Sequence, residues 1–232
     1  MWSAFQIVRH DLKYFGVSKT LYDVLVRAVN MLVVFKTLMV LKVNSVDPQF
    51  LTIGKEFQAR FLSYSEMADL QAKPDFEVSE SFLNGVRRKG DACFGVFQGP
   101  KLVSFCWYST QPTETSDGLM IAVPPDHVYL YKAFTCQENR GARLLAFGAS
   151  RGLHEYLGRG FTTVALYIES NNFSSLKAFS RMGADLIGRL WVIKLLGGTI
   201  IYASGGLRRS NVTFTKYAPA MLSHPVQHNG LI

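Results

Sequence analysis

The sequence predicts an α/β (α+β) fold, in which helices flank a mixed β-sheet. One observation is a segment over residues 126–158 that has the pattern of a strand, a tight polar turn and a helix. Another is a β-rich run at 162–168, which is followed by a second stretch of helical character. A third is a hairpin pattern at 93–108, where two β-rich runs flank a turn that contains glycine and proline. Together these patterns predict alternating strands and helices.

The turn after the first of these strands has the features of an anion-binding site. The polar cluster 137–140 breaks the apolar run, and Gly141 opens a helical pattern that Gly158 ends. The apolar residues of this pattern are Leu144, Leu145, Gly148, Ala149, Leu153 and Leu157. A strand that feeds a helix through such a turn directs free backbone N–H groups and the positive helix end at one spot. Phosphate groups bind at such spots.

Two blocks of the sequence resemble the GNAT acyltransferase superfamily, whose members move an acyl group from coenzyme A to an amine. They are the strand, turn and helix at 126–158, and the β-rich run at 162–168 with the helical stretch after it. The first block is similar to the family's fourth strand and pyrophosphate turn, which reads arginine, glycine, any residue, glycine, any residue, glycine or alanine. The second is similar to the fifth strand and the helix after it, where the family's offsets are met by Asn172, Ser175, Phe179 and Gly183. The resemblance covers about residues 57–202. It implies the GNAT fold, with a mixed central sheet of about six to seven strands that splays between the fourth and fifth.

Three residues depart from the family pattern. Arg143 stands at the second glycine and Leu145 at the third small residue, so the backbone approaches a ligand differently there. Arg143 can compensate by offering a guanidinium group to a phosphate. Phe179 stands where the family usually keeps a tyrosine as general acid, and a phenyl ring cannot donate a proton. Another group or solvent must then protonate the departing thiolate, or the protein binds a ligand without turnover.

Residues 1–50 are predicted to form an N-terminal helical arm. The apolar run at 21–43 has roughly helical spacing, and its four charged residues argue against a transmembrane helix. Two interpretations remain open. The run is either a basic amphipathic helix on an anionic membrane or a helical cap or dimer-forming arm packed on the main domain. A hinge is expected around Pro48.

The segment from 57 to 118 supplies the elements before the central strand. A short alternating strand is predicted at 57–62, a helix from Ser65 with that serine as its cap, and a second helix at 79–86. In the family, the loop between these two helices usually shapes the acceptor site. The polar stretch 110–118 is expected either to border that pocket or to be a solvated loop.

The strand before the turn carries the catalytic candidates. His127, Tyr129 and Tyr131 alternate, so they are expected to share one face of the sheet. His127 stands near the place where some family members keep a glutamate base, and a neutral imidazole accepts a proton near pH 7. Tyr129 or Tyr131 is a candidate for the acid that Phe179 cannot be.

The resemblance also implies a binding site for a coenzyme A thioester. Backbone N–H groups of the turn would bind the pyrophosphate, and a bulged strand before it would pair with the pantetheine arm. The residues predicted for this site are Phe134, Thr135, Arg140, Gly141, Ala142, Arg143, Leu144, Asn172 and Ser175.

The C-terminal part is predicted to contain the last two strands and a tail. The strands are expected at 186–195 and 199–203, joined by a turn at the Gly197-Gly198 pair. The domain division is then an arm at 1–50, an acyltransferase-like domain at 51–206 and a partly ordered tail at 207–232.

The composition of the chain limits the classes of partner that it is expected to bind. The 232 residues carry a formal charge of +8, which favours an anionic partner such as coenzyme A, acidic lipid or an acyl carrier protein. The sequence contains no nucleic-acid recognition motif, so nucleic acid is not expected as a partner. Cys93, Cys106 and Cys136 are widely spaced and include no Cys-x-x-Cys pair, so neither a disulfide framework nor a metal site is indicated. A cytoplasmic location fits, with membrane association possible only through residues 1–46.

These observations predict an N-acyltransferase that moves an acyl group, acetyl by default, from a coenzyme A thioester to an amine. The amine would be a small molecule or related to a lipid. One alternative is a long-chain N-acyltransferase that uses acyl-CoA or acyl carrier protein at a membrane surface. Another is an acyl-CoA-binding module without activity.

Overall fold

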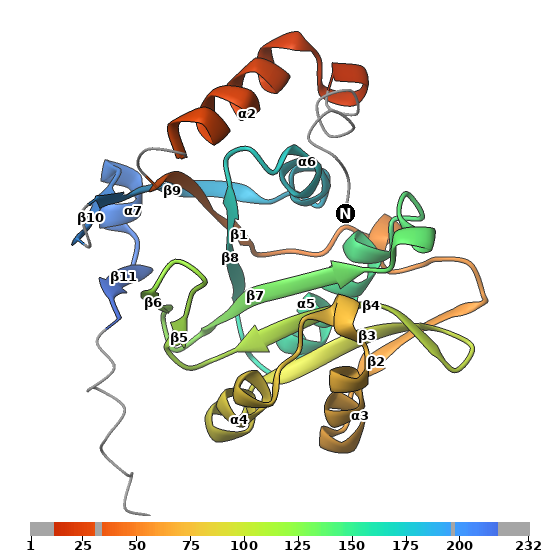
Figure 1. Ribbon diagram of the computed structural model, residues 1–232. Coiled ribbons are helices and arrows are strands. Elements are labelled where there is room, and N and C mark those ends of the chain that lie inside the picture. The colour runs from red at the N-terminus through yellow and green to blue at the C-terminus, as the bar shows by residue number, and fades with distance from the viewer. Residues whose placement is uncertain (1–11, 31–33, 196–197, 218–232) are drawn as a thin grey trace, which may run out of the picture.

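The computed structural model describes residues 12–30, 34–195 and 198–217 (Figure 1). Within these residues, eight strands form one sheet in the order β10-β9-β1-β8-β7-β4-β3-β2, and three form a second sheet in the order β11-β6-β5. The large sheet contains β1 (Val34–Val43), β2 (Phe57–Phe61), β3 (Ala92–Gln98), β4 (Lys101–Ser109), β7 (His127–Thr135), β8 (Thr163–Glu169), β9 (Asp185–Leu195) and β10 (Gly198–Ala203). The small sheet contains β5 (Thr113–Glu114), β6 (Leu119–Ala122) and β11 (Thr213–Lys216). The helices are α2 (Val17–Asn30), α3 (Tyr64–Asp69), α4 (Glu80–Lys89), α5 (Leu144–Gly158), α6 (Phe173–Arg181) and α7 (Gly205–Arg209). The predicted fold class, a mixed sheet flanked by helices, is confirmed.

The N-terminal region supplies a central strand, which corrects the prediction of one amphipathic helix over 21–43. The helix α2 ends at Asn30, and β1 begins at Val34. β1 pairs antiparallel with β8 on one side and with β9 on the other, so the large sheet has one strand more than predicted. The reason is that residues 34–43 are apolar enough to be covered on both faces. Periodicity alone does not separate such a buried strand from a helix.

The sheet splays between β7 and β8, as the resemblance implied. These two strands are parallel, but they pair only through His127–Tyr129 and Thr163–Ala165. β7 continues to Thr135 and β8 to Glu169, so both strands run on beyond their last shared pair. The backbone of each strand therefore has unpaired groups at the opening.

Helices cover both faces of the sheet. Alternate residues of β4 point to opposite sides: Phe105 and Trp107 lie in the core beneath α3 and α4, whereas Cys106 and Tyr108 lie beneath α5. α6 packs on the α5 side, where Phe179 joins the same core. The small sheet and α7 cover the other face of β1, β8 and β9. This arrangement leaves the splay between β7 and β8 bordered by α5 and α6.

Part of the predicted tail is ordered structure. α7 begins at Gly205, and β11 pairs antiparallel with β6, which the sequence analysis did not predict as a strand. The core residues Leu207 and Val212 are buried between these elements. Short segments of this kind have too few residues to show a periodicity, and their burial comes from the strand that they meet. Residues 218–232 of the predicted tail lie outside the described residues.

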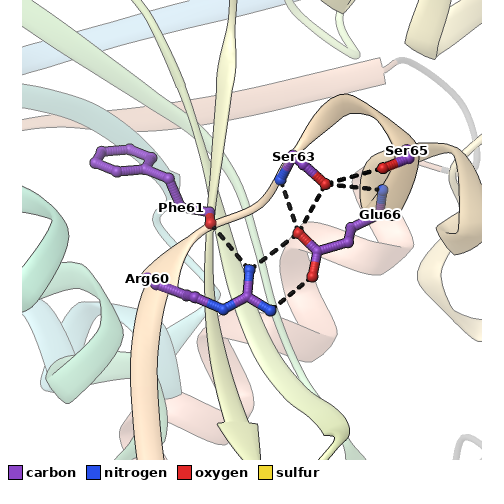
Figure 2. Close-up of polar contacts among 5 residues, drawn as sticks. All are labelled: Arg60, Phe61, Ser63, Ser65 and Glu66. Atoms are coloured by element: carbon purple, nitrogen blue, oxygen red, sulfur yellow. Dashed lines mark hydrogen bonds and ion pairs between the residues drawn. The ribbon is translucent and has the colours of Figure 1, made fainter.

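The start of α3 is held by a capping box and an arginine (Figure 2). Ser63 is the N-cap, rather than the predicted Ser65: its side chain accepts from the backbone N–H of Glu66, whose carboxylate accepts from the backbone N–H of Ser63. Arg60, on β2, donates to both carboxylate oxygens of Glu66, at 2.9 and 2.6 Å. The arginine and Ser63 hold the pKa of Glu66 down, at about 2, against an ordinary value of 4.5.

Replacing Glu66 by glutamine is expected to lower the free energy of unfolding at pH 7 by about 0.2–1 kcal/mol, because the solvent-screened ion pair with Arg60 is lost, whereas glutamine can still close the capping box. A carboxylate with a lowered pKa stabilises the fold above its unfolded pKa, and this contribution decreases as pH falls toward the folded value. The difference between wild type and E66Q should therefore shrink between pH 5 and pH 3 in urea unfolding curves. A difference that does not depend on pH would contradict this. E80Q, which removes a charge from the first turn of α4, is the matched control.

The three cysteines are free thiols, and all are buried. Among the described residues, no helix combines the length and the apolar character that crossing a membrane requires.

Candidate functional site

The turn between β7 and α5 has two residues with left-handed backbone. A short 3₁₀ turn, Gln137–Asn139, follows the strand, and Gly141 then takes a positive φ of 89°. Arg143, the N-cap of α5, also lies in the left-handed region, with φ at 59°. A non-glycine residue is uncommon there, and such backbone strain is concentrated at functional sites. The position at which the sequence replaces the family's glycine is thus one where the backbone favours glycine.

The helix α5 begins at Leu144, three residues after the predicted start at Gly141. Its first-turn N–H groups therefore belong to residues 144–146, which have no partner within the helix. These three residues line a cavity of about 610 Å³, which we call the turn cavity. Ala142, also predicted for the site, is not among the residues that line it, and its N–H donates to the carbonyl of Asn139.

The turn cavity brings together nearly all of the predicted donor-site residues. Of that set, those lining it are Phe134, Thr135, Arg140, Gly141, Arg143, Leu144, Asn172 and Ser175. Its described lining also includes Arg181, which the sequence analysis missed, and contains no carboxylate. Arg181 could have been found by spacing, since Ser174, Ala178 and Arg181 lie on one face of α6. Three arginines around a helix start make a strongly anion-attracting cavity.

Asn172 fixes the position of α6 at the edge of this cavity. It is the N-cap of the helix, and its side-chain oxygen accepts from the N–H of Ser175, at 3.2 Å, and from the hydroxyl of Ser174, at 3.1 Å. The side-chain nitrogen is left to donate elsewhere. The spacing by which the sequence analysis selected Asn172 and Ser175 is thus the spacing of a helix cap.

A second cavity, of about 440 Å³, lies in the splay between β7 and β8, and we call it the splay cavity. It shares Ala133, Leu145, Asn172 and Ser175 with the turn cavity, so the two adjoin. Phe179 lies in its lining and is buried in the core. The splay cavity therefore contains the phenyl ring at the position where the family usually has its tyrosine.

A β-bulge re-aims the strand at this point. In the pairing of β4 with β7, Trp107 is opposite Lys132 and Tyr108 is opposite Leu130, which leaves Tyr131 as the extra residue. The bulge expected near Phe134 and Thr135 is thus at Tyr131, while the last two residues of the strand pair regularly. A bulge redirects the side chain of the extra residue.

A third cavity, of about 540 Å³, lies beyond the bulge, and we call it the tyrosine cavity. It shares Tyr131 and Tyr167 with the splay cavity. Residues 112–116 and α4 also line it, so the polar stretch at 110–118 borders a pocket. The three cavities therefore lie in a row: the turn cavity adjoins the splay cavity between β7 and β8, and the splay cavity adjoins the tyrosine cavity.

The tyrosines at this junction are packed together and remain protonated. Tyr129 and Tyr131 have ring centroids 5.8 Å apart, and Tyr129 stacks on Tyr167 at 6.3 Å. Burial is the main factor that raises the pKa of all three hydroxyl groups, and the carboxylate of Asp91 raises that of Tyr131 further. Each is therefore a neutral hydroxyl group at neutral pH, able to donate or accept a hydrogen bond.

His127 lies apart from Tyr131 and from the three cavities. It lies at the start of β7, four residues before Tyr131, which corresponds to about 13 Å along a strand. Its ring nitrogen Nδ1 is 2.9 Å from the Asp126 carboxylate, and it is not among the residues that line the three cavities. Counting along the strand placed it near the site, but the tertiary structure does not bring it there.

Lys36 of β1 supports the far side of the splay. Its ammonium group lies 2.7 Å from the carboxylates of both Asp117 and Glu169. Glu169 lines the splay cavity, and Asp117 belongs to the loop beside the tyrosine cavity. The strand that the sequence analysis predicted as a helix therefore ties together the two elements that flank the junction.

Comparison with known proteins adds evidence on the fold. By sequence, the chain matches no protein-family model, and no curated protein is similar enough to count as a relative. By structure, it is similar to a GNAT-family protein from Novosphingobium aromaticivorans, with a TM-score of 0.51 and 16% identity over 74% of this chain and 67% of that one. A GCN5-related N-acetyltransferase-like protein from Streptococcus suis has a TM-score of 0.51 and 13% identity, over 75% of this chain and 67% of the other.

A tandem GNAT protein from the clavulanic acid biosynthesis pathway is similar as well, with a TM-score of 0.50 and 10% identity. That alignment covers 72% of this chain but only 54% of the longer protein. At identities this low, the likeness concerns the arrangement of the elements. It agrees with the motif at the β7–α5 turn and with the splay between β7 and β8, and the chain therefore has the GNAT fold.

Proposed function

We propose that the chain is an acyltransferase that moves an acyl group, acetyl by default, from a coenzyme A thioester to an amine. The observation that carries this proposal is the continuity of the three cavities across the splay. A donor in the turn and splay cavities would present its thioester near Tyr131 and Tyr167. An amine in the tyrosine cavity would reach the same two residues from the other side.

The turn cavity has the chemistry that coenzyme A requires. The first-turn N–H groups of α5 and the three arginines complement the pyrophosphate and the further phosphate of the ligand. The pantetheine arm would then follow the splay, where the edges of β7 and β8 offer unpaired backbone groups. The residues present therefore fit a coenzyme A thioester.

The transfer step itself needs little beyond positioning. The amine nitrogen attacks the thioester carbonyl carbon directly, and holding both reactants in one geometry supplies most of the acceleration. Phe179 offers no proton at the junction, whereas the hydroxyl groups of Tyr131 and Tyr167 are the polar groups that line both sides of it. These two tyrosines are the side chains that we expect to interact with the reacting atoms.

The test is calorimetry with coenzyme A, acetyl-CoA and a long-chain acyl-CoA, followed by turnover with a panel of amines. Release of the free thiol can be followed with a thiol reagent, because the protein's own three cysteines are buried. Binding with turnover supports the proposal, and binding without turnover of any amine indicates the binding-module alternative. If none of the three ligands binds but acyl carrier protein donates, the donor is the carrier protein. No binding and no transfer would refute the proposal.

Replacing Arg143 by glycine is expected to lower coenzyme A affinity by about tenfold, because one charge-assisted contact to a phosphate is lost. The same change should leave the free energy of unfolding unchanged or raise it by up to about 1 kcal/mol, since glycine relieves the left-handed backbone at a smaller entropic cost. Calorimetry and thermal unfolding measure the two effects. R143K, which retains the positive charge, should keep most of the affinity. Loss of stability with unchanged affinity would show that Arg143 has a structural role only.

The surface of α2 favours a second candidate, in which the donor carries a long acyl chain and the protein works at a membrane. Val17, Leu21 and Leu25 are 72%, 66% and 59% exposed. Figure 1 shows α2 lying over α6, and contacts with the segment that starts α6 hold it there: Tyr22 hydrogen-bonds Ser170 at 2.8 Å. The apolar surface is therefore attached to the helix that lines the turn cavity.

The segment that carries this surface is basic, with Lys13 before the helix and Lys19 over the Phe173 ring of α6, and positive charge favours an anionic lipid. Co-sedimentation with vesicles that contain anionic lipid, compared with neutral vesicles, tests the idea. L21E/L25E should abolish the binding if it exists. Equal recovery of the wild type with and without vesicles would reject a membrane role for α2.

A further inference from the structure

We propose that Asp91 is a positioning residue for the transfer step, which holds the hydroxyl group of Tyr131 so that its oxygen accepts a hydrogen bond from the incoming amine. The inference rests on the proposed function and deepens it. In this arrangement the Tyr131 hydroxyl group donates its proton to Asp91, and its oxygen accepts a hydrogen bond from the amine. Neither the sequence nor the family motif indicates Asp91.

Asp91 is buried where α4 turns into β3. It is 2% exposed and follows Gly90, which ends the helix in the left-handed conformation. Its Oδ2 accepts from the hydroxyl group of Tyr131 at 3.0 Å and from the ammonium group of Lys89 at 2.7 Å. Its Oδ1 is buried and has no hydrogen-bond partner among the described residues. A carboxylate is costly to bury, so its retention at this place calls for an explanation.

Lys89 holds this carboxylate and the tyrosine ring together. Besides the ion pair, its ammonium group donates to the hydroxyl oxygen of Thr113 at 3.0 Å and lies 5.1 Å from the centroid of the Tyr131 ring. Lys89 lines the tyrosine cavity, whereas Asp91 is not among the residues that line it. The ring is thus held between this charge pair, whose carboxylate is buried, and the junction.

The direction of the hydrogen bond follows from the chemistry of the groups. A carboxylate paired with an ammonium group only accepts hydrogen bonds, so Tyr131 donates its single hydroxyl proton to Asp91. The lone pairs of the Tyr131 oxygen remain, and the β-bulge makes this side chain line both the splay and tyrosine cavities. Tyr131 is therefore set to accept from an N–H group and not to protonate a thiolate.

This arrangement stabilises the positive charge that develops on the amine nitrogen during transfer. As the nitrogen–carbon bond forms, positive charge grows on the amine nitrogen, and an oxygen polarised by a carboxylate stabilises it. The carbon–sulfur bond then breaks with its electron pair on sulfur. The nitrogen releases its extra proton to solvent, and the thiolate takes a proton from solvent. Asp91 itself keeps its charge throughout.

The test compares wild type, D91N, Y131F and the double variant D91N/Y131F with acetyl-CoA and an amine that the wild type accepts. D91N keeps the shape of the side chain and removes its charge, so kcat is expected to fall about tenfold or more with both KM values little changed. In the Y131F background, the same substitution should change kcat less than about twofold, because residues that act as a unit are not additive. An equal loss in both backgrounds, or an unchanged kcat in D91N, would overturn the inference.

A second measurement does not depend on activity. Fluorotyrosine placed at position 131 reports the hydrogen bond of its hydroxyl group through the fluorine chemical shift at neutral pH, in the wild type and in D91N. The Tyr131 hydroxyl group donates to the Asp91 carboxylate, so the chemical shift should change in D91N; a chemical shift that does not change would overturn the inference whatever the turnover. If D91N is unstable because Lys89 is left without its partner, D91N/K89M removes both charges and takes its place. A wild type that transfers to no amine would reject the proposed function and this role with it, whereas turnover that D91N leaves intact rejects this role alone.

Discussion

Replacing Ser175 by tryptophan is expected to lower the affinity for coenzyme A by about 100-fold or more, the equivalent of about 2.7 kcal/mol. Ser175 lines both the turn cavity and the splay cavity, at the place where the two adjoin. An indole ring there would fill the route that the pantetheine arm takes from the pyrophosphate to the thioester. Calorimetry with coenzyme A measures the effect directly and needs no knowledge of the acceptor.

The same substitution should have little effect on stability. The interaction that Ser175 makes in the helix cap is through its backbone N–H, which tryptophan retains, and the side chain is only half-buried. Ser180→Trp is the matched control, because Ser180 is exposed on the same helix and is not among the residues that line the three cavities. If S175W binds coenzyme A as tightly as S180W does, the donor does not lie in the splay.

Removing the hydroxyl group of Tyr131 should lower kcat by about 10²-fold, the usual cost of losing one preorganised polar contact to the reacting atoms. The ring of Y131F still fills the junction, so coenzyme A affinity and the amine KM should change little. Initial rates at saturating acetyl-CoA, with the amine concentration varied, separate kcat from KM.

Tyr156→Phe provides the comparison for Y131F. Tyr156 is also a buried tyrosine, but it packs against Phe61 and Phe161 and lines none of the three cavities. Its loss of a hydroxyl group should leave kcat unchanged. A Y131F variant that is as active as Y156F would remove Tyr131 from the mechanism and direct attention to Tyr167.

The residues that line the turn cavity could be predicted in large part from the sequence. Gly141, Arg143 and Asn172 act through local geometry: a positive φ, a helix start and a helix cap are set by residues a few positions apart. Such features have fixed spacings, so a motif is enough to find them. The N-cap Ser63 could have been found in the same way, because Glu66 follows it at the spacing of a capping box.

The contacts around the tyrosine cavity could not be predicted in this way. Tyr131 meets Asp91 across 40 positions of sequence, and Lys36 meets Glu169 across 133. His127 seemed equivalent to Tyr131 because strict alternation puts both on one face, but alternation does not give the distance along a strand from the site. No spacing in the chain connects these residues, since they lie on different strands or on loops between them.

The sequence by itself determined the order of the strands and helices around the β7–α5 turn, the glycine turn that precedes α5 and the cap of α6. These depend on hydrophobic period, turn chemistry and helix ends, which are local properties. Only the tertiary structure decided that residues 34–43 form a central strand, that β7 bulges at Tyr131 and that a buried carboxylate holds this tyrosine. The physical reason is that pairing, register and bulges depend on which surfaces the neighbouring strands offer, and those neighbours come from distant parts of the chain.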